Sequence, residues 1–364
     1  MNPFDIRPEK LAQEMAEYSR KLGKGMENLL NADKIDTGVT PKEVVYTEDK
    51  LTLYRYHAPE GVEQNPVPVL ITYALVNRPY MTDIQENRST IKNLLAAGQD
   101  VYLIDWGYPD GADSSLTLDD YINGYLDRCV DVIRGRHGLD KINILGICQG
   151  GAFSLCYAAL HQDKVKNLVT MVTPVDFQTP DNLLSSWVQH MDIDLLVDTL
   201  GNVPGELLNW TFLSLKPFSL TGQKYVNMVD ILDDEEKVKN FLRMEKWIFD
   251  SPDQAGETFR QFIKGFYQQN GLVNGTVEIG GRPVDLKKIT CPLLNIYGEQ
   301  DHLVPPDASR ALNGLTGSKD YTELAFPGGH IGIYVSGKAQ AQIPPAIGSW
   351  LDQRSLAPEK KKKK

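Results

Sequence analysis

The residues Gly146-Ile147-Cys148-Gln149-Gly150 join a predicted strand directly to a predicted helix. Residues 141–145 precede them and indicate a buried parallel strand, and residues 151–155 indicate the start of a helix. The glycines allow a tight turn and let the helix begin close to the strand. A side chain at such a turn is lifted into a cleft, where the helix N-terminus favours a negative charge on it. We therefore expect Cys148 to be a nucleophile rather than a buried structural cysteine.

The spacing of these residues is that of the G-x-S-x-G nucleophile elbow of the α/β-hydrolase fold, with cysteine in place of serine. That fold places an acid and then a histidine later in the chain. Asp301 follows a predicted strand at 293–298, and His330 follows a predicted strand at 321–326 in a glycine-rich turn. Two alternatives stay open. His302 adjoins Asp301 and could be the base, and Asp301 could be a loop carboxylate or a helix cap.

The rest of the chain alternates strands and helices. Two antiparallel strands over 43–56 precede strands at 67–73, 100–106 and 165–172, and helices are expected at 88–98 and 118–136. This order predicts an α/β-hydrolase fold with a doubly wound, mostly parallel sheet. We expect an N-terminal helical arm at 1–40, with an amphipathic helix over 7–31. The catalytic core then comprises 41–176 and 286–353, with a helical cap insertion at 177–285 and a basic tail at 354–364.

The composition excludes several classes of function. The 364 residues hold 38 Lys and Arg against 48 Asp and Glu, a net charge of −10, and five of the positive charges are the lysines of the tail. This acidity argues against a nucleic-acid surface. No apolar run is long enough for a membrane span, and the N-terminus lacks the apolar core of a signal peptide. The 4 cysteines lack metal-site spacing, so we expect no metal and a cytoplasmic protein with reduced thiols.

A cysteine nucleophile suits acyl transfer from a thioester. It forms a new thioester of similar energy, so the acyl group stays activated and can pass to an alcohol. We expect His330 to take the proton of Cys148, and the backbone N–H groups of Gln149 and Val76 to hold the oxyanion. Asp301 either orients His330 or helps it deprotonate an incoming hydroxyl, and both roles stay open here.

Five blocks of this sequence resemble the catalytic C subunit (PhaC) of the class III polyhydroxyalkanoate (PHA) synthases. The resemblance extends from near residue 2 to about residue 352. The family's Cys, Asp and His correspond to Cys148, Asp301 and His330 without departure. The blocks are Tyr73-Ala74-Leu75-Val76-Asn77-Arg78-Pro79-Tyr80-Met81, Asp105-Trp106-Gly107, Gly146-Ile147-Cys148-Gln149-Gly150-Gly151, Asp301-His302-Leu303-Val304-Pro305-Pro306 and Pro327-Gly328-Gly329-His330-Ile331-Gly332.

This resemblance implies an acyltransferase that polymerises short-chain (R)-3-hydroxyacyl-CoA, typically 3-hydroxybutyryl-CoA, into a polyester such as polyhydroxybutyrate. CoA is released from the substrate, so no separate cofactor is implied. The family implies a location at the surface of cytoplasmic granules. It also implies a hetero-oligomer with an E-type subunit (PhaE), and a homodimer is a further option.

Two other interpretations use the same sequence features. An α/β-hydrolase-fold cysteine thioesterase would share the three side chains but pass the acyl group to water. A non-catalytic granule scaffold would retain only the fold, and the intact set of Cys148, Asp301 and His330 argues against it.

Overall fold

The structure is a computed structural model that describes residues 13, 16, 20, 35–217 and 223–355. The predicted amphipathic helix over 7–31 and nearly all of the predicted tail therefore lie outside the described residues. What is described falls into two compact units: a smaller unit of Met1–Thr37 with Asn209–Asp250, and a larger unit of Gly38–Leu208 with Ser251–Lys364.

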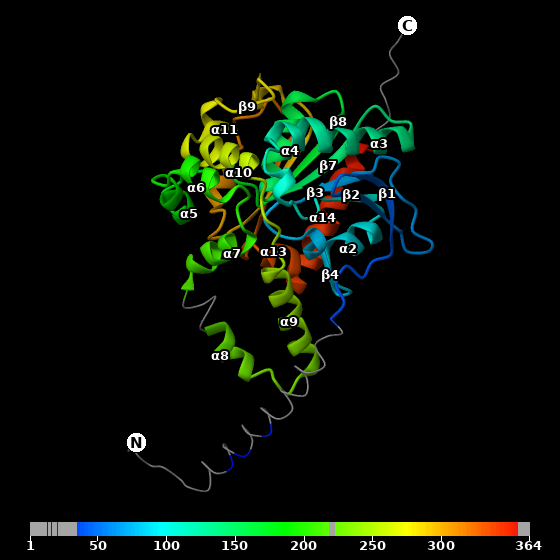
Figure 1. The fold of residues 1–364 in the computed structure, drawn as a ribbon. Coiled ribbons are helices and arrows are strands. Elements are labelled where there is room, and N and C mark those ends of the chain that lie inside the picture. The colour runs from blue at the N-terminus through cyan, green and yellow to red at the C-terminus, as the bar shows by residue number, and fades with distance from the viewer. Residues whose placement is uncertain (1–12, 14–15, 17–19, 21–34, 218–222, 356–364) are drawn as a thin grey trace. The chain divides into compact units, whose positions relative to one another are not determined.

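Among the described residues of the larger unit, eight strands form one sheet in the order β1-β2-β6-β3-β7-β8-β11-β12 (Figure 1). β1 pairs antiparallel with β2, and β2 antiparallel with β6, whereas the pairs from β6 to β12 are parallel. The strands are β1 (Lys42–Glu48), β2 (Leu51–Tyr56), β3 (Val69–Thr72), β6 (Val101–Asp105), β7 (Ile142–Ile147), β8 (Val165–Met171), β11 (Leu293–Gly298) and β12 (Tyr321–Phe326). The predicted mostly parallel sheet is confirmed.

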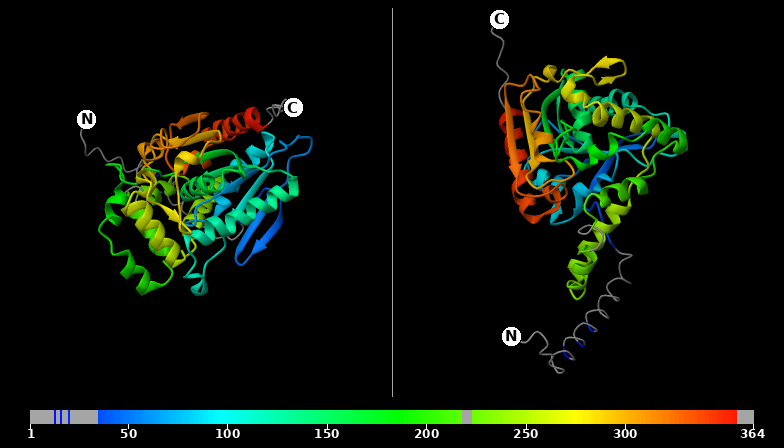
Figure 2. Two further views of the ribbon diagram at one scale, coloured as in Figure 1. Left: turned by 90° about the horizontal axis from the view of Figure 1, so that it is seen from above. Right: turned by 90° about the vertical axis from the view of Figure 1, so that its left-hand side faces the viewer.

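The central strands are mostly apolar and are buried along their whole length because both faces of the sheet are covered. Every residue of β3, β7 and β11 is buried. Helices α2 (Thr90–Ala96) and α14 (Gly337–Ser355) pack against each other on one face. Helices α3 (Asp127–His137) and α4 (Gln149–Leu160) lie on the other face (Figure 2). The carboxyl ends of the parallel strands therefore meet at one edge, where this class of fold places its site.

Several short elements were not predicted from the sequence. The antiparallel pairs are β4 (Asp83–Gln85) with β5 (Arg88–Ser89), and β9 (Glu278–Ile279) with β10 (Arg282–Pro283). The predicted helix at 118–136 begins as a π-helix, η4 (Asp120–Leu126), and continues as α3. The remaining helices of the larger unit are η2 (Pro79–Thr82), η3 (Gly111–Asp113), α5 (Leu183–Val188), α6 (Ile193–Leu200), α10 (Gly256–Phe262), the π-helix η6 (Ile263–Gln268), α11 (Gly271–Asn274), η7 (Leu286–Lys288), α12 (Pro306–Arg310) and α13 (Gly332–Val335).

The described residues 209–217 and 223–250 of the smaller unit are mostly helical. Helix α7 (Gly205–Ser214) spans the boundary between the units, and α8 (Lys224–Val229) and α9 (Glu235–Phe249) follow it. Asp234 caps α9 by accepting a hydrogen bond from the N–H of Lys237 at 3.1 Å. A salt bridge of 2.7 Å between Lys224 and Glu245 joins α8 to α9.

The residues of the predicted cap, 177–285, are divided between the units, because only 209–250 belong to the smaller one. Phe177 and residues of α10 and η6 pack on the elbow helix α4 through aromatic side chains. Phe262 contacts both Phe153 of α4 and Phe177, with ring centroids 5.9 and 6.0 Å apart. Other aromatic residues of this stretch are exposed, namely Trp187, Trp210 and Phe249. The cap as a functional unit stays a prediction.

Candidate active site

Cys148 sits between β7 and α4 with a backbone that few L-residues adopt. Its φ and ψ are 55° and −125°, and its N–H donates to the carbonyl of Met171 at 2.9 Å. Val172, which follows Met171 at the end of β8, also has a positive φ of 45°. A positive φ at a β-branched residue is unusual and costly. Strain of this kind gathers at functional sites, where the surrounding structure holds it.

The glycines around Cys148 are needed because other segments pack closely against them. The residue with a positive φ in this turn is Cys148 itself. A Cβ on Gly146 would lie 2.6 Å from the Cα of Gly151. One on Gly150 would lie 2.2 Å from the carbonyl oxygen of Thr72, and one on Gly151 only 1.8 Å from Oγ1 of Thr173. The expectation that glycine lets the helix start close to the strand fits this geometry. The same absence of side chains allows the tight turn, whereas the positive φ within the turn is that of Cys148.

His330 and Asp301 are joined as the sequence predicted. Nδ1 of His330 lies 2.7 Å from Oδ2 of Asp301, and both side chains are buried. The other carboxylate oxygen, Oδ1, accepts from the N–H groups of Leu303 and Val304, each at 2.9 Å. Asp301 therefore has both contacts that the sequence left open. Its Oδ1 binds the backbone of its own loop, and its Oδ2 binds His330. His330 is thus the histidine whose contact with Asp301 is established, and its choice over His302 as the base stays a prediction.

The loops that carry these two residues are bound to each other by the backbone. The N–H of Glu299 donates to the carbonyl of Phe326 at 2.8 Å, and the N–H of Gln300 donates to that of Gly328 at 3.0 Å. A Cβ on Gly298 would lie 2.6 Å from the carbonyl oxygen of Gly328. The ends of the neighbouring strands β11 and β12 thus hold the acid and the histidine in register.

The imidazole of His330 also lies close enough to the side chain of Cys148 for the two groups to interact electrostatically. Burial of the ring disfavours its positive charge. The negative charges of Asp301 and Cys148, with the hydrogen bond to Asp301, outweigh that effect and raise the pKa of His330 from its ordinary 6.5 to about 10. The arrangement therefore favours a protonated imidazole at His330, directly beside the side chain of Cys148.

The loop after β3 lies against the elbow. The Nε1–H of Trp106 donates to the carbonyl of Tyr73 at 3.0 Å, and the N–H of Leu75 donates to Oε1 of Gln149 at 3.0 Å. The next N–H, that of Val76, has no acceptor in the described part of the chain. Gln149 is the first residue of α4, so its own N–H has no partner within the helix. The expected oxyanion donors Gln149 and Val76 are thus on adjoining segments.

Three tyrosines near the nucleophile were not foreseen. Burial, followed by the negative charge of Cys148, raises the pKa of both Tyr73 and Tyr267. Tyr334 is fully buried, and burial followed by the charge of Tyr73 also raises its pKa. Tyr73 and Tyr334 lie within or next to the motif blocks, so sequence proximity could have found them. Tyr267 lies on the π-helix η6, which no sequence signal marked.

The other three cysteines differ from Cys148 in their surroundings. Cys129 and Cys156 are fully buried, and burial raises the pKa of both thiols. Burial also raises the pKa of Cys291, to about 11. All four cysteines lie in the described chain and none forms a disulfide. Within the part of the chain that the structure describes, no group of three or more His, Cys, Asp or Glu side chains is placed to hold a metal ion.

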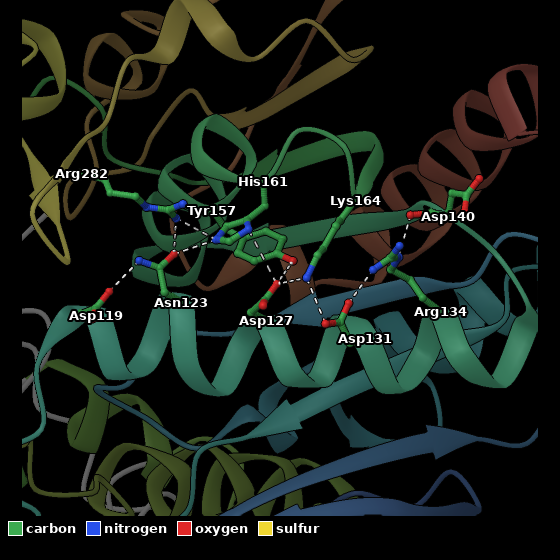
Figure 3. Close-up of polar contacts among 10 residues, drawn as sticks. All are labelled: Asp119, Asn123, Asp127, Asp131, Arg134, Asp140, Tyr157, His161, Lys164 and Arg282. Atoms are coloured by element: carbon green, nitrogen blue, oxygen red, sulfur yellow. Dashed lines mark hydrogen bonds and ion pairs between the residues drawn. The ribbon is translucent and has the colours of Figure 1, made fainter.

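A polar network holds the far end of the elbow helix (Figure 3). His161, directly after α4, stacks on Tyr157 with ring centroids 4.7 Å apart. The hydroxyl of Tyr157 donates to Asp127 at 2.7 Å, and Arg282 of β10 donates to Asn123 and to His161 at 3.0 Å. The network thus ties α4 to η4, α3 and the β9–β10 hairpin. Its other members are Asp119, Asp131, Arg134, Asp140 and Lys164.

Comparison with known proteins shows which family this chain resembles. Residues 67–336 match the family model described as alpha/beta hydrolase fold. The poly(3-hydroxyalkanoate) polymerase subunit PhaC of Allochromatium vinosum is 79% identical, over 97% of this chain and 100% of that protein. The chain belongs to the poly(3-hydroxyalkanoate) polymerase subunit PhaC family. The subunits of that name from Thiocystis violacea and a Synechocystis species are 76% and 57% identical, covering 98% and 97% of this chain and 100% and 96% of those proteins.

The predicted resemblance to class III PhaC and the predicted fold and acyltransferase class are confirmed by this membership. A monoacylglycerol lipase structure from Paleococcus ferrophilus has a TM-score of 0.55 and 17% identity, over 84% of this chain and 100% of that one, which supports the fold alone. The PhaC relatives are named as subunits, which implies a polymerase of more than one subunit. No helix in the described residues is long and apolar enough to cross a membrane.

Proposed function

We propose that this PhaC family member polymerises (R)-3-hydroxyacyl-CoA, with 3-hydroxybutyryl-CoA as the typical monomer, through an acyl thioester on Cys148. The observation that supports this most directly is the position of His330. It binds Asp301 at 2.7 Å through Nδ1 and lies close enough to Cys148, on the strained elbow, for the charge of that side chain to raise the pKa of the ring. Nucleophile, base and orienting acid are thus in line.

In the first step, His330 holds the proton of the Cys148 thiol, and the sulfur attacks the thioester carbonyl of the substrate. The N–H groups of Gln149 and Val76 stabilise the negative charge that develops on the carbonyl oxygen. The carbon–sulfur bond to CoA then breaks, and the departing CoA thiolate takes the proton from His330. The products are CoA and an acyl group bound to Cys148 as a new thioester.

In the second step, a hydroxyl group attacks that thioester. The hydroxyl belongs to a hydroxyacyl unit or to the end of the growing polyester, and His330 accepts its proton. An ester bond forms as the bond to the sulfur of Cys148 breaks, which restores the thiol and lengthens the polyester by one unit. Asp301 keeps Nδ1 of His330 occupied, so Nε2 faces the reacting atoms in both steps. Orientation of His330 is the role of Asp301 that this geometry supports.

Water must be kept from the acyl thioester, since hydrolysis would end the chain. The groups around the nucleophile support this requirement, because Tyr73, His330, Asp301 and Tyr334 are each at most 5% exposed. We further propose that the chain works with an E-type subunit, PhaE, at the surface of cytoplasmic polyester granules, as the family resemblance implies.

The test is to incubate the purified chain with 3-hydroxybutyryl-CoA, with and without PhaE, and to follow released CoA and insoluble polyester together. The proposal requires the ester units in polymer to match the CoA released. Free 3-hydroxybutyrate in place of polymer would support the thioesterase alternative. No release of CoA in either mixture would contradict both.

A further inference from the structure

The loop that carries Val76 is fixed to the α/β core at three points. The carbonyl of Tyr73 accepts from Trp106, and the N–H of Leu75 donates to Gln149. On the far side of Val76, the guanidinium of Arg78 donates to Asp105 at 2.7 Å and to the carbonyl of Gly107 at 3.0 Å. These partners belong to the elbow helix and to the end of β6, which are parts of the rigid scaffold.

A fourth contact of the Val76 loop is made with a residue far away in the sequence. Asn77, the residue directly after Val76, donates through Nδ2 to Oγ of Ser251 at 2.6 Å. Ser251 lies 174 positions later in the chain. It is the first residue of the larger unit after the segment Asn209–Asp250. The loop beside the expected oxyanion donor is therefore bonded to the point where the chain returns from that segment.

Ser251 is itself held in place by a short antiparallel stem. Val203 and Gln254 exchange backbone hydrogen bonds, each 2.9 Å long, and the N–H of Gly205 donates to Oδ1 of Asp253 at 2.9 Å. A Cβ on Gly205 would lie 2.2 Å from the carbonyl oxygen of Ser251. The two arms of the stem, residues 203–205 and 251–254, thus touch backbone to backbone. A displacement of the stem would move the hydroxyl that Asn77 binds.

We propose that Asn77 and Ser251 are positioning residues, and that their hydrogen bond fixes the N–H of Val76 for the oxyanion and links it to this stem. The proposal rests on the proposed function, in which Val76 is an oxyanion donor. An N–H group stabilises an oxyanion only when it points at the position of the developing charge. With Leu75 bonded on one side and Asn77 on the other, the peptide of Val76 has little freedom to turn away.

The test uses the full chain in its active assembly with PhaE, and 3-hydroxybutyryl-CoA as the probe. The variants are Asn77→Ala, Ser251→Ala and the double variant, with Ser251→Thr to retain the hydroxyl. Each is checked by circular dichroism and thermal unfolding before kinetics. The matched control is Asn202→Ala. Asn202 also bonds near the stem, to the carbonyl of Asp110 and the N–H of Gly256, but not to the Val76 loop.

We expect each alanine variant to lower kcat about tenfold, less than the hundredfold or more that follows loss of a whole oxyanion donor, with KM within about twofold. The double variant should be no slower than either single one, because both remove the same bond. Ser251→Thr should recover most of the rate, and Asn202→Ala should stay within about twofold of the parent.

Wild-type kcat in either folded alanine variant, additive losses in the double variant, or an equal loss in Asn202→Ala would overturn the proposal. If Asn77→Ala does not fold, the kcat values of Ser251→Ala and Ser251→Thr alone test the proposal. Mass spectrometry of the acylated parent enzyme separates this outcome from failure of the proposed function. An acyl group on Cys148 with normal rates in the variants removes only the positioning role, whereas an unmodified Cys148 in an active parent removes the proposed function itself.

Discussion

Nδ1 of His330 lies 2.7 Å from Oδ2 of Asp301, with 5% of the histidine side chain and none of the aspartate side chain exposed. Water therefore does little to screen the charge of the carboxylate from the imidazole. Asp301 cannot rotate away, because its second oxygen accepts two backbone hydrogen bonds. The pair fixes which nitrogen of His330 faces Cys148, and the protonation of the ring then depends on both neighbours.

The first prediction concerns the pKa of His330. Asp301→Asn and Cys148→Ala should each lower it from about 10 toward the ordinary 6.5, because each removes a negative charge beside the ring. NMR titration of the His330 ring measures this directly in the three proteins, and His57, whose partners do not change, serves as the internal reference. An unchanged His330 pKa in Cys148→Ala would contradict the coupling between the two side chains.

The same shift predicts how stability depends on pH. The folded-state pKa of His330 lies above its unfolded value, so the stabilisation from its charged form is complete below pH 6.5 and is lost as the pH rises toward about 10. Cys148→Ala should reduce this alkaline loss of unfolding free energy. Urea unfolding of both proteins from pH 6 to pH 10 measures it, and parallel curves would contradict the prediction.

The second prediction concerns His161 at the far end of the elbow helix. Burial is the largest effect on the pKa of His161 and lowers it. The positive charges of Arg282 and Lys164 lower this pKa further, whereas the negative charges of Asp127 and Asp163 oppose the shift. The unfolded chain therefore takes up a proton on this ring before the folded chain does. Stability should fall as the pH drops below 6.5.

His161→Gln should remove part of that acid-side loss, because glutamine keeps a polar side chain at this position but does not titrate. Comparing urea unfolding midpoints of the parent and His161→Gln between pH 7 and pH 5 tests this. The variant is expected to have the flatter profile, and an equally steep profile in both proteins would show that His161 is not the titrating group.

The third prediction compares two glycines. Gly151→Ala should destabilise the chain by about 1–3 kcal/mol and reduce activity, because the new methyl group would overlap Thr173 at the elbow. Gly135→Ala is the matched control, since it lies in helix α3 with nothing within 4 Å of the added carbon. It should stabilise the chain by about 0.5–1 kcal/mol. Denaturant unfolding gives both values, and equal effects of the two substitutions would contradict the packing explanation.

The sequence predicted the sheet, the elbow and the three proposed catalytic side chains because each depends on local order. A buried parallel strand is a short apolar run, and the residue after it falls at the carboxyl edge of the sheet. Cys148 and Asp301 each follow such a run, and His330 follows the half-buried strand β12, so their convergence could be expected without coordinates. The apolar burial of β7 and β11 bears this out.

Features that depend on contacts between distant segments could not be predicted in this way. The bond from Asn77 to Ser251 joins residues 174 positions apart, and no periodicity marks either one. The positive φ of Cys148 has no signal in the sequence, because this conformation is usual for glycine and not for cysteine. The π-helix η6, which brings Tyr267 near the nucleophile, has the same residue pattern as an ordinary buried helix.

The central claim is that the acyl group passes through Cys148. The most direct measurement is mass spectrometry of the chain quenched during turnover of 3-hydroxybutyryl-CoA, for the parent enzyme, Cys148→Ala and Cys291→Ala. The account predicts a hydroxybutyryl group on the peptide that contains Cys148 in the parent and in Cys291→Ala, and neither an adduct nor CoA release in Cys148→Ala. Polymer formation by a folded Cys148→Ala protein, or an adduct confined to another residue, would contradict it.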